Sequence, residues 1–321
     1  KDTDLALAIG TKLADFTTGS WANFENPNFK LVSLNTARYD TTKHLATPVI
    51  SDAKVGLQKI SEALGDWKAP DDWYKRAIKE KNEWDAYVEK QSGPTNQEEP
   101  SYAHAVGAVY RNSDPSDIVV TAAGGLVGEV VQVWKPKQLN TFETEWGFSC
   151  MGYEISGALG IKMAKPDQDV VVFVGDGSYL LNNTDIYSSV IYDQKLIIIV
   201  CDNGGHMVIN RLQLAKGGKE YICNLRAARA TNLKFVDFEN HAKSMGANAE
   251  TVSSTSELEA AYKRAKDSDK TYVITIKTHG YEWLEGTAFW ESPTLQDPIT
   301  DNNKSALEDF ESGKSKQRKG V

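Results

Sequence analysis

One acidic and one amide side chain stand just past two apolar runs of this sequence. Asp176 follows residues 170–174 within Gly-Asp-Gly-Ser, and Asn203 follows residues 196–200. A carboxylate, an amide and nearby glycine carbonyls make an incomplete all-oxygen cation site, which suits Mg²⁺ because that ion fills its shell with water and phosphate. The alternative is a pair of tight turns after buried strands, which Gly-Asp-Gly alone would favour.

A sheet is needed to bring these two groups together. Both apolar runs are short, rich in β-branched residues and not alternating, which is typical of strands buried on both faces. With a polar turn at 178–183 and a helix at 184–194, they form a parallel strand–helix–strand unit of about 30 residues. Since parallel strands end at the same edge, Asp176 and Asn203 are expected to lie side by side.

Glycines surround both polar groups and allow a ligand to approach the backbone. They are Gly175, Gly177, Gly204 and Gly205. Another glycine-rich stretch, residues 122–128, follows a predicted strand at 118–121. Alone it is as compatible with an ordinary turn as with a ligand loop, but at the edge that holds Asp176 it is a candidate phosphate contact.

The length, net charge and cysteine content of the chain limit the class of protein. The 321 residues carry a net charge of −8 and a pI near 5.3, which argues against a nucleic-acid partner and fits a soluble, cytoplasmic enzyme. Cys150, Cys201 and Cys223 lack metal-ligand spacing and are interpreted as reduced thiols. No apolar run approaches the roughly 18 residues of a membrane span, so no membrane partner is expected.

We predict an α/β protein with a doubly wound parallel sheet. Residues 1–67 form a thin α/β domain, with strands at 5–9 and 30–35 and a helix at 52–64. Residues 68–100 form a helix and linker, 101–290 the main domain, and 291–321 a charged tail that is frayed or draped on a neighbour. The thin first domain and the start without Met lead us to expect a missing N-terminal part.

The sequence Gly175-Asp176-Gly177-Ser178, closed by Asn203, resembles the thiamine-diphosphate signature of the acetolactate synthase and pyruvate decarboxylase superfamily. The resemblance implies the pyrophosphate domain of a thiamine-diphosphate-binding fold, preceded by a partial Rossmann-like middle domain. It also implies that Asp176, Asn203 and the carbonyl of Gly205 bind Mg²⁺, which in turn holds the cofactor diphosphate.

The same resemblance assigns further contacts. Met151, which from the residues alone is interpreted as a core residue, would wedge between the two cofactor rings, and the carbonyl of Ser149 would meet the aminopyrimidine. The implied cofactor-binding residues are Gly124, Gly125, Leu126, Val127, Ser149, Met151, Gly175, Asp176, Gly177, Ser178, Asn203 and Gly205.

Three features after Gly205 are left open. His206 stands beside the metal site and is interpreted either as a structural histidine or as a substrate or proton-transfer residue. Arg211 could bind an anion, or it could be solvated or paired. Residues 212–223 are interpreted as a mobile loop that could form a lid.

Several segments are similar to one branch of the superfamily, the 3D-(3,5/4)-trihydroxycyclohexane-1,2-dione hydrolases of inositol catabolism. They are residues 15–21, 145–154, 175–183 and 208–213. This implies hydrolysis of a carbon–carbon bond in a polyhydroxy cyclic dione by a homodimer or homotetramer. The chain would be the C-terminal half and inactive alone, because the glutamate that activates the cofactor would lie on the missing half, in the same or a separate chain.

Two other functions are compatible with the same residues. One is a decarboxylase or carboligase of 2-oxo acids within the superfamily, and the other is a non-catalytic nucleotide-binding module. A P-loop or Rossmann enzyme is disfavoured, because neither Gly-x-x-x-x-Gly-Lys nor Gly-x-Gly-x-x-Gly occurs in the expected context.

Overall fold

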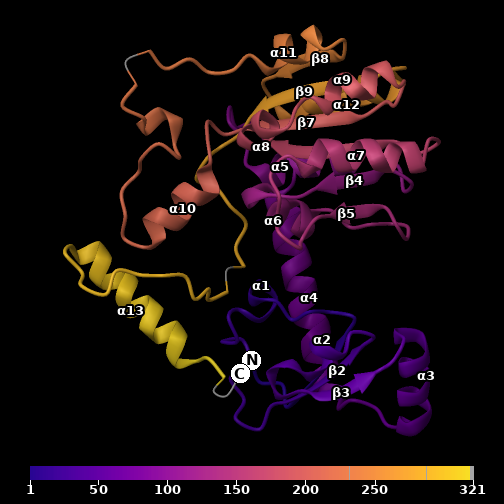
Figure 1. The fold of residues 1–321 in the computed structure, drawn as a ribbon, viewed down its shortest axis with the longest axis vertical. Helices are drawn as coiled ribbons and strands as arrows, with labels where there is room; N and C mark the ends of the chain where they lie inside the picture. Colours follow the sequence, from indigo (N-terminus) through magenta and orange to yellow (C-terminus); the bar gives the residue numbers. More distant parts are fainter. Residues whose placement is uncertain (231, 287, 319–321) are drawn as a thin grey trace. The chain divides into compact units, whose positions relative to one another are not determined.

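The structure, a computed structural model, describes residues 1–230, 232–286 and 288–318, and the chain divides into two compact units (Figure 1). Unit 1 comprises Lys1–Ala77, Ala215–Gly218 and Glu285–Val321, and unit 2 comprises Ile78–Leu214 and Lys219–Leu284. The boundary near residue 77 falls within helix α4 (Asp71–Gln91), which lies in the helix and linker segment expected over 68–100.

Unit 2 is built on a six-stranded parallel sheet in the order β5-β4-β6-β7-β9-β8. Its strands are β4 (Ile118–Thr121), β5 (Phe142–Thr144), β6 (Val170–Gly175), β7 (Ile197–Asp202), β8 (Asn248–Val252) and β9 (Tyr272–Lys277). The chain runs from β4 outward to β5 and then returns to β6 on the other side of β4. This reversal leaves a crevice at the carboxyl ends of the strands, where α/β sheets bind ligands.

Helices cover both faces of this sheet (Figure 1). One face packs against α5 (Tyr102–Arg111), α6 (Gly124–Val133) and α12 (Thr255–Asp267), and the other against α7 (Tyr153–Ala164), α8 (Asp176–Leu181), α9 (Asp185–Ile191) and α11 (Phe238–Ser244). Helix α10 (Met207–Ala215) and the short helix η2 (Leu225–Ala227) follow β7.

The predicted doubly wound sheet is confirmed by the way β6 is buried. Val171 and Phe173 pack into the core on one face, while Val172 and Val174 pack into the core on the other. Because both faces are dry, the strand is apolar at every position and shows no alternation.

Two segments expected to be irregular are helical. The predicted polar turn at 178–183 is wrong because α8 spans Asp176–Leu181 and buries Tyr179 completely in the core. The predicted glycine-rich loop at 122–128 is wrong beyond Ala123, because α6 starts at Gly124 and buries Leu126 and Val130. In both cases tertiary packing of apolar side chains outweighs the turn-like local sequence.

Unit 1 contains a three-stranded parallel sheet in the order β1-β2-β3. Its elements are β1 (Leu5–Ile9), α1 (Asp15–Thr18), β2 (Lys30–Asn35), α2 (Arg38–Thr42), η1 (Lys43–Leu45), β3 (Thr47–Ile50) and α3 (Ala53–Leu64). The apolar sequence of β1 would favour burial, but Leu5, Leu7 and Ile9 are exposed. Ala8 is buried in the small core, and the partly buried Ala6 packs against it.

The carboxyl-terminal segment is not the frayed tail that we expected. It forms helix α13 (Asp301–Ser315) and packs within unit 1. The backbone N–H of Glu291 donates to Ser20 Oγ at 2.8 Å, and that of Arg318 donates to the carbonyl of Trp21 at 3.1 Å. In the part of the chain that the structure describes, no helix has both the length and the apolar character to cross a membrane.

Candidate functional site at the carboxyl edge of the sheet

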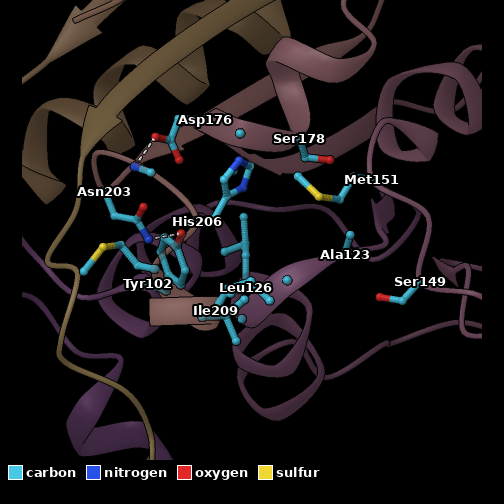
Figure 2. Close-up of a pocket in the computed structure, with 17 residues that line it drawn as sticks. Tyr102, Ala123, Leu126, Ser149, Met151, Asp176, Ser178, Asn203, His206 and Ile209 are labelled. Carbon is cyan, nitrogen blue, oxygen red and sulfur yellow. Dashed lines mark hydrogen bonds between the residues drawn. The ribbon is translucent and has the colours of Figure 1, made fainter. Parts of the chain in front are cut away.

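A cavity of about 240 Å³ opens at the carboxyl edge of the sheet in unit 2 (Figure 2). Its walls come from the β4–α6 connection, the segment before α7, the start of α8 and the segment after β7. All of the predicted cofactor-binding residues except Val127 line it, and so does His206. Val127 lies one residue past the lining residue Leu126 and is buried within α6.

The structure brings Asp176 and Asn203 to the same cavity. Strands β6 and β7 pair with Gly175 opposite Cys201, so the residues that follow each strand emerge side by side. Asp176 begins α8, and its Oδ2 accepts a hydrogen bond from the backbone N–H of Gly205 at 2.7 Å. One predicted metal ligand therefore holds the backbone of another.

The amide of Asn203 is fixed at one end and free at the other. Its Nδ2 donates to Tyr102 Oη at 2.6 Å, as the dashed line in Figure 2 shows. Its Oδ1 is buried and has no hydrogen-bond partner among the described residues. Because a buried acceptor without a partner costs free energy, this oxygen is suited to a ligand such as a cation.

The electrostatics at Asp176 also favour a cation. Burial first, and then the negative charge of Asp202, raise the pKa of the Asp176 carboxyl to about 7, although the N–H groups of Gly205 and Gly177 act in the opposite direction. Lys277 pairs with Asp202. The described residues contain no group of three or more His, Cys, Asp or Glu side chains placed to hold a metal. A cation here would need non-acidic ligands as well, as Mg²⁺ at a phosphate usually has.

Two glycines permit close approaches that a side chain would prevent. Gly205 has φ +142°, and a Cβ there would lie 2.3 Å from the carbonyl oxygen of Cys223. A Cβ on Gly177 would lie 2.6 Å from Cε1 of His206, so this ring packs directly over the glycine. The path of the backbone around Asp176 therefore depends on glycine at both positions.

The amino end of α6 forms another wall of the cavity. Its first residues, Gly124, Gly125 and Leu126, line the cavity, and the N-cap residue Ala123 supplies no side-chain acceptor. The first N–H groups of a helix have no partner within the helix, and they carry partial positive charge. This wall can therefore receive an anion.

Met151 and Ser149 lie on the other side of the cavity from Asn203 (Figure 2). Met151 is 38% exposed, so it belongs to the cavity wall and the interpretation as a core residue is wrong. Ser149 Oγ donates to the carbonyl of Ala122 at 3.2 Å, which ties this segment to the β4–α6 connection.

The structure gives Arg211 a partner and orders part of the predicted loop. The Arg211 guanidinium lies 5.1 Å above the Trp283 ring and does not line the cavity. Helix α10 extends to Ala215, so residues 212–215 are helical, contrary to the predicted loop. Glu220 then accepts hydrogen bonds from Asn210 and Tyr281.

Sequence reasoning missed several residues of this site. Tyr102, Ala123 and residues 207–209 line the cavity. Glu154 lies behind it and accepts a hydrogen bond from Ser178. Nothing local marks Tyr102, whose partner Asn203 is 101 residues away, or Glu154, whose partners Ala123 and Ser178 are 31 and 24 residues away. The only available signal for Glu154 was its place in the segment 145–154.

Comparisons with known proteins agree with this geometry. Residues 122–276 match the family model described as thiamine pyrophosphate enzyme, C-terminal TPP binding domain. That range includes the cavity residues from Gly124 to Ile209.

Curated relatives match nearly the whole chain. The 3D-(3,5/4)-trihydroxycyclohexane-1,2-dione hydrolase of Bacillus licheniformis is 34% identical, over 89% of this chain and 50% of its own length. The protein of the same name from Lacticaseibacillus casei is 32% identical, over 97% of this chain and 52% of its own length. The chain therefore spans about half the length of the curated relatives it matches.

A solved structure shares the fold. The Rhodococcus jostii RHA1 thiamine diphosphate-dependent 4-hydroxybenzoylformate decarboxylase aligns with a TM-score of 0.63 and 15% identity, covering 86% of this chain and 49% of that chain. At that identity the likeness shows the fold alone. Together, the matched domain and the relatives show that residues 122–276 of this chain belong to the family of C-terminal TPP-binding domains of thiamine pyrophosphate enzymes.

Proposed function

We propose that this chain is the cofactor-holding C-terminal half of a thiamine-diphosphate- and Mg²⁺-dependent hydrolase. The full-length protein would open a polyhydroxy cyclic 1,2-dione in inositol catabolism by hydrolysing a carbon–carbon bond. The names of the relatives, with 32–34% identity along most of the chain, support the reaction class. The observation that carries the cofactor assignment is the buried Oδ1 of Asn203, which lies in the cavity that contains Asp176 and has no hydrogen-bond partner among the described residues.

Asp176, Asn203 and the carbonyl of Gly205 would hold the Mg²⁺. Two features support this set. The Asn203 amide is oriented by Tyr102 so that its oxygen has no hydrogen-bond partner in the part of the chain that the structure describes. The Asp176 carboxyl is buried beside Asp202, where a cation would relieve the cost of charge. All three donors are oxygens, as Mg²⁺ requires.

The remaining walls would hold the organic part of the cofactor. Gly124, Gly125 and Leu126 at the amino end of α6, together with Gly175, Gly177 and Ser178, would surround the diphosphate. Ser149 and Met151 would contact the rings. We leave Val127 out of this set because it does not line the cavity. When bound, thiamine diphosphate supplies the nucleophilic carbon and the electron sink that carbon–carbon bond cleavage needs.

Several predictions made from the sequence stay part of this proposal. Residues 1–67 would be the remainder of a middle domain, and the activating glutamate would come from the other half of the protein. Assembly as a homodimer or homotetramer is also proposed. The acidic net charge and the unpaired thiols support a cytoplasmic location.

The test of the cofactor site is calorimetric titration of thiamine diphosphate with Mg²⁺ into the full-length protein and its Asp176→Asn and Asn203→Ala variants. Both variants should lose Mg²⁺-dependent binding while keeping the fold. Asp117→Asn is the matched control, because Asp117 is equally buried but pairs with Lys266. Binding that is unchanged in the two site variants would refute the metal assignment.

The test of the reaction is turnover of the cyclic dione by the full-length protein, with pyruvate as the comparison substrate. Release of an open-chain acid from the dione supports the hydrolase. Turnover of pyruvate alone would overturn it in favour of a 2-oxo acid decarboxylase.

A further inference from the structure

Glu154 is a buried carboxylate that the proposed function does not yet use. It lies in the first turn of α7 and is 1% exposed. Buried acids are usually paired with a cation, but the hydrogen-bond partners of Glu154 in the described part of the chain are neutral N–H and O–H groups. An ionised carboxylate only accepts hydrogen bonds, so it is suited to gathering several donors.

These donors come from three separate segments. Oε1 accepts from the backbone N–H of Ala123 at 3.2 Å, and Oε2 accepts from that of Gly152 at 2.9 Å. The hydroxyl of Ser178 donates at 2.8 Å and also accepts from the N–H of Gly152 at 2.8 Å. One side chain therefore joins the β4–α6 connection, the segment before α7 and helix α8.

Each joined segment supplies a wall of the cavity. Ala123 is the N-cap of α6, Gly152 directly follows Met151, and Ser178 lies two residues past Asp176. The same contacts decide what these groups can do. The Ser178 hydroxyl points at Glu154, so its proton is engaged away from a cofactor in the cavity.

Neither helix that begins in these segments, α6 or α7, has a side-chain hydrogen bond at its N-cap. Ala123 caps α6 without a side-chain hydrogen bond, and Gly152 turns with φ +93° into α7, again without a side-chain cap. Burial raises the pKa of the Glu154 carboxyl, while the donors from Ser178, Ala123 and Gly152 lower it. Desolvation of this acid, which lies where the three walls meet, therefore costs folding free energy.

We propose that Glu154 is a positioning residue of the cofactor site, which holds these three walls at the spacing that one thiamine diphosphate molecule requires. The inference rests on the proposed function, because it assumes that the cofactor occupies this cavity. It adds a residue that contacts neither metal nor cofactor and acts through Ala123, Gly152 and Ser178.

The experiment measures the dissociation constant of thiamine diphosphate at saturating Mg²⁺, with the near-ultraviolet circular dichroism of the bound cofactor, in the full-length protein. Glu154→Gln keeps the size of the side chain but turns one acceptor into a donor that faces N–H groups. We expect binding weaker by on the order of 10-fold and an altered dichroism band. Ser178→Ala keeps the hydrogen bonds that Glu154 accepts from Ala123 and Gly152, so it should have a smaller effect.

Asp117→Asn is the matched control for a general loss of stability, since Asp117 is a buried carboxylate of the same unit that pairs with Lys266 and Tyr262. It should lower the melting temperature without changing the dissociation constant. Unchanged affinity and dichroism in Glu154→Gln would overturn the proposal, and so would equal weakening in Asp117→Asn. A parent protein that does not bind thiamine diphosphate would instead refute the proposed function.

Discussion

Replacing Tyr102 by Phe should weaken Mg²⁺ binding, although the substitution changes none of the proposed metal ligands. Tyr102 Oη accepts the hydrogen bond from Asn203 Nδ2 at 2.6 Å, and both residues are 5% exposed. The two ends of an amide differ little in shape, so a half-turn about the last bond would exchange oxygen for nitrogen. This hydrogen bond therefore favours the orientation in which the oxygen of Asn203 faces the cavity.

The size of the effect follows from the orientation that the variant prefers. Against a phenylalanine ring, Nδ2 loses a buried acceptor whose net value is about 1–1.5 kcal/mol. Turning the nitrogen toward the cavity recovers that free energy, so only roughly one molecule in ten would keep the oxygen in place. The apparent dissociation constant equals the intrinsic constant divided by the fraction of molecules in the binding-competent orientation, so Mg²⁺ binding should weaken about 10-fold.

The assay is calorimetric titration of Mg²⁺ into the full-length protein saturated with thiamine diphosphate. Tyr262→Phe is the matched control: it is another fully buried tyrosine of unit 2, and its hydroxyl donates to Asp117 at 2.7 Å. Both variants should lose thermal stability, but only Tyr102→Phe should lose Mg²⁺ affinity. Equal Mg²⁺ affinity in Tyr102→Phe and the parent protein, at a lowered melting temperature, would refute the reasoning.

Three further changes have expected outcomes. Gly205→Ala should destabilise the fold by at least about 2 kcal/mol in urea unfolding, because its Cβ would meet the Cys223 carbonyl at 2.3 Å; a loss below 0.5 kcal/mol, roughly the size of a surface substitution, would contradict this. Glu129→Gln should be more stable than the parent protein at pH 8 and lose most of that advantage at pH 5. Burial raises the pKa of Glu129 from 4.5 to about 7, so the folded state binds its proton more tightly and stability falls as pH rises through that window, by roughly 3 kcal/mol; an advantage independent of pH would refute it. Phe173→Ala should cost about 3–5 kcal/mol by opening a cavity in the core, measured by the same unfolding assay, and leave Mg²⁺ affinity unchanged; altered affinity in that variant would show that the site and the core are coupled.

The pair Asp176 and Asn203 could be predicted because parallel strands constrain their ends. Residues 170–174 and 196–200 are apolar at every position, so they had to be strands buried on both faces. Once they pair in parallel, the residue after each strand must emerge at one edge. The structure adds the register, with Gly175 opposite Cys201, which also places Asp202 beside Asp176 and so affects its pKa.

Other features depend on contacts that no local pattern records. Tyr102 lies 101 residues from Asn203 in the sequence, and nothing around it distinguishes it from an ordinary buried tyrosine at a helix start. Strand β3 contains Pro48, which argues against a strand from sequence but is tolerated at the edge of the sheet. Strand β5 has only three residues, too few to show a pattern.

The two edges of the large sheet differ in how many of their acids pair with a lysine, and this contrast supports a ligand site at the carboxyl edge. At the amino edge, Lys266 pairs with Asp117 at 2.6 Å and with Asp169 at 3.2 Å. At the carboxyl edge, Asp202 pairs with Lys277, but burial raises the pKa of both Asp176 and Glu154, and the hydrogen bonds to these two acids come from neutral donors. Charge without a counterion reduces the stability of the metal-free fold, whereas a ligand that binds only the folded state restores about 2.7 kcal/mol at a concentration 100 times its dissociation constant. We therefore expect a bound ligand at the carboxyl edge to supply the positive charge that balances the buried carboxylates there.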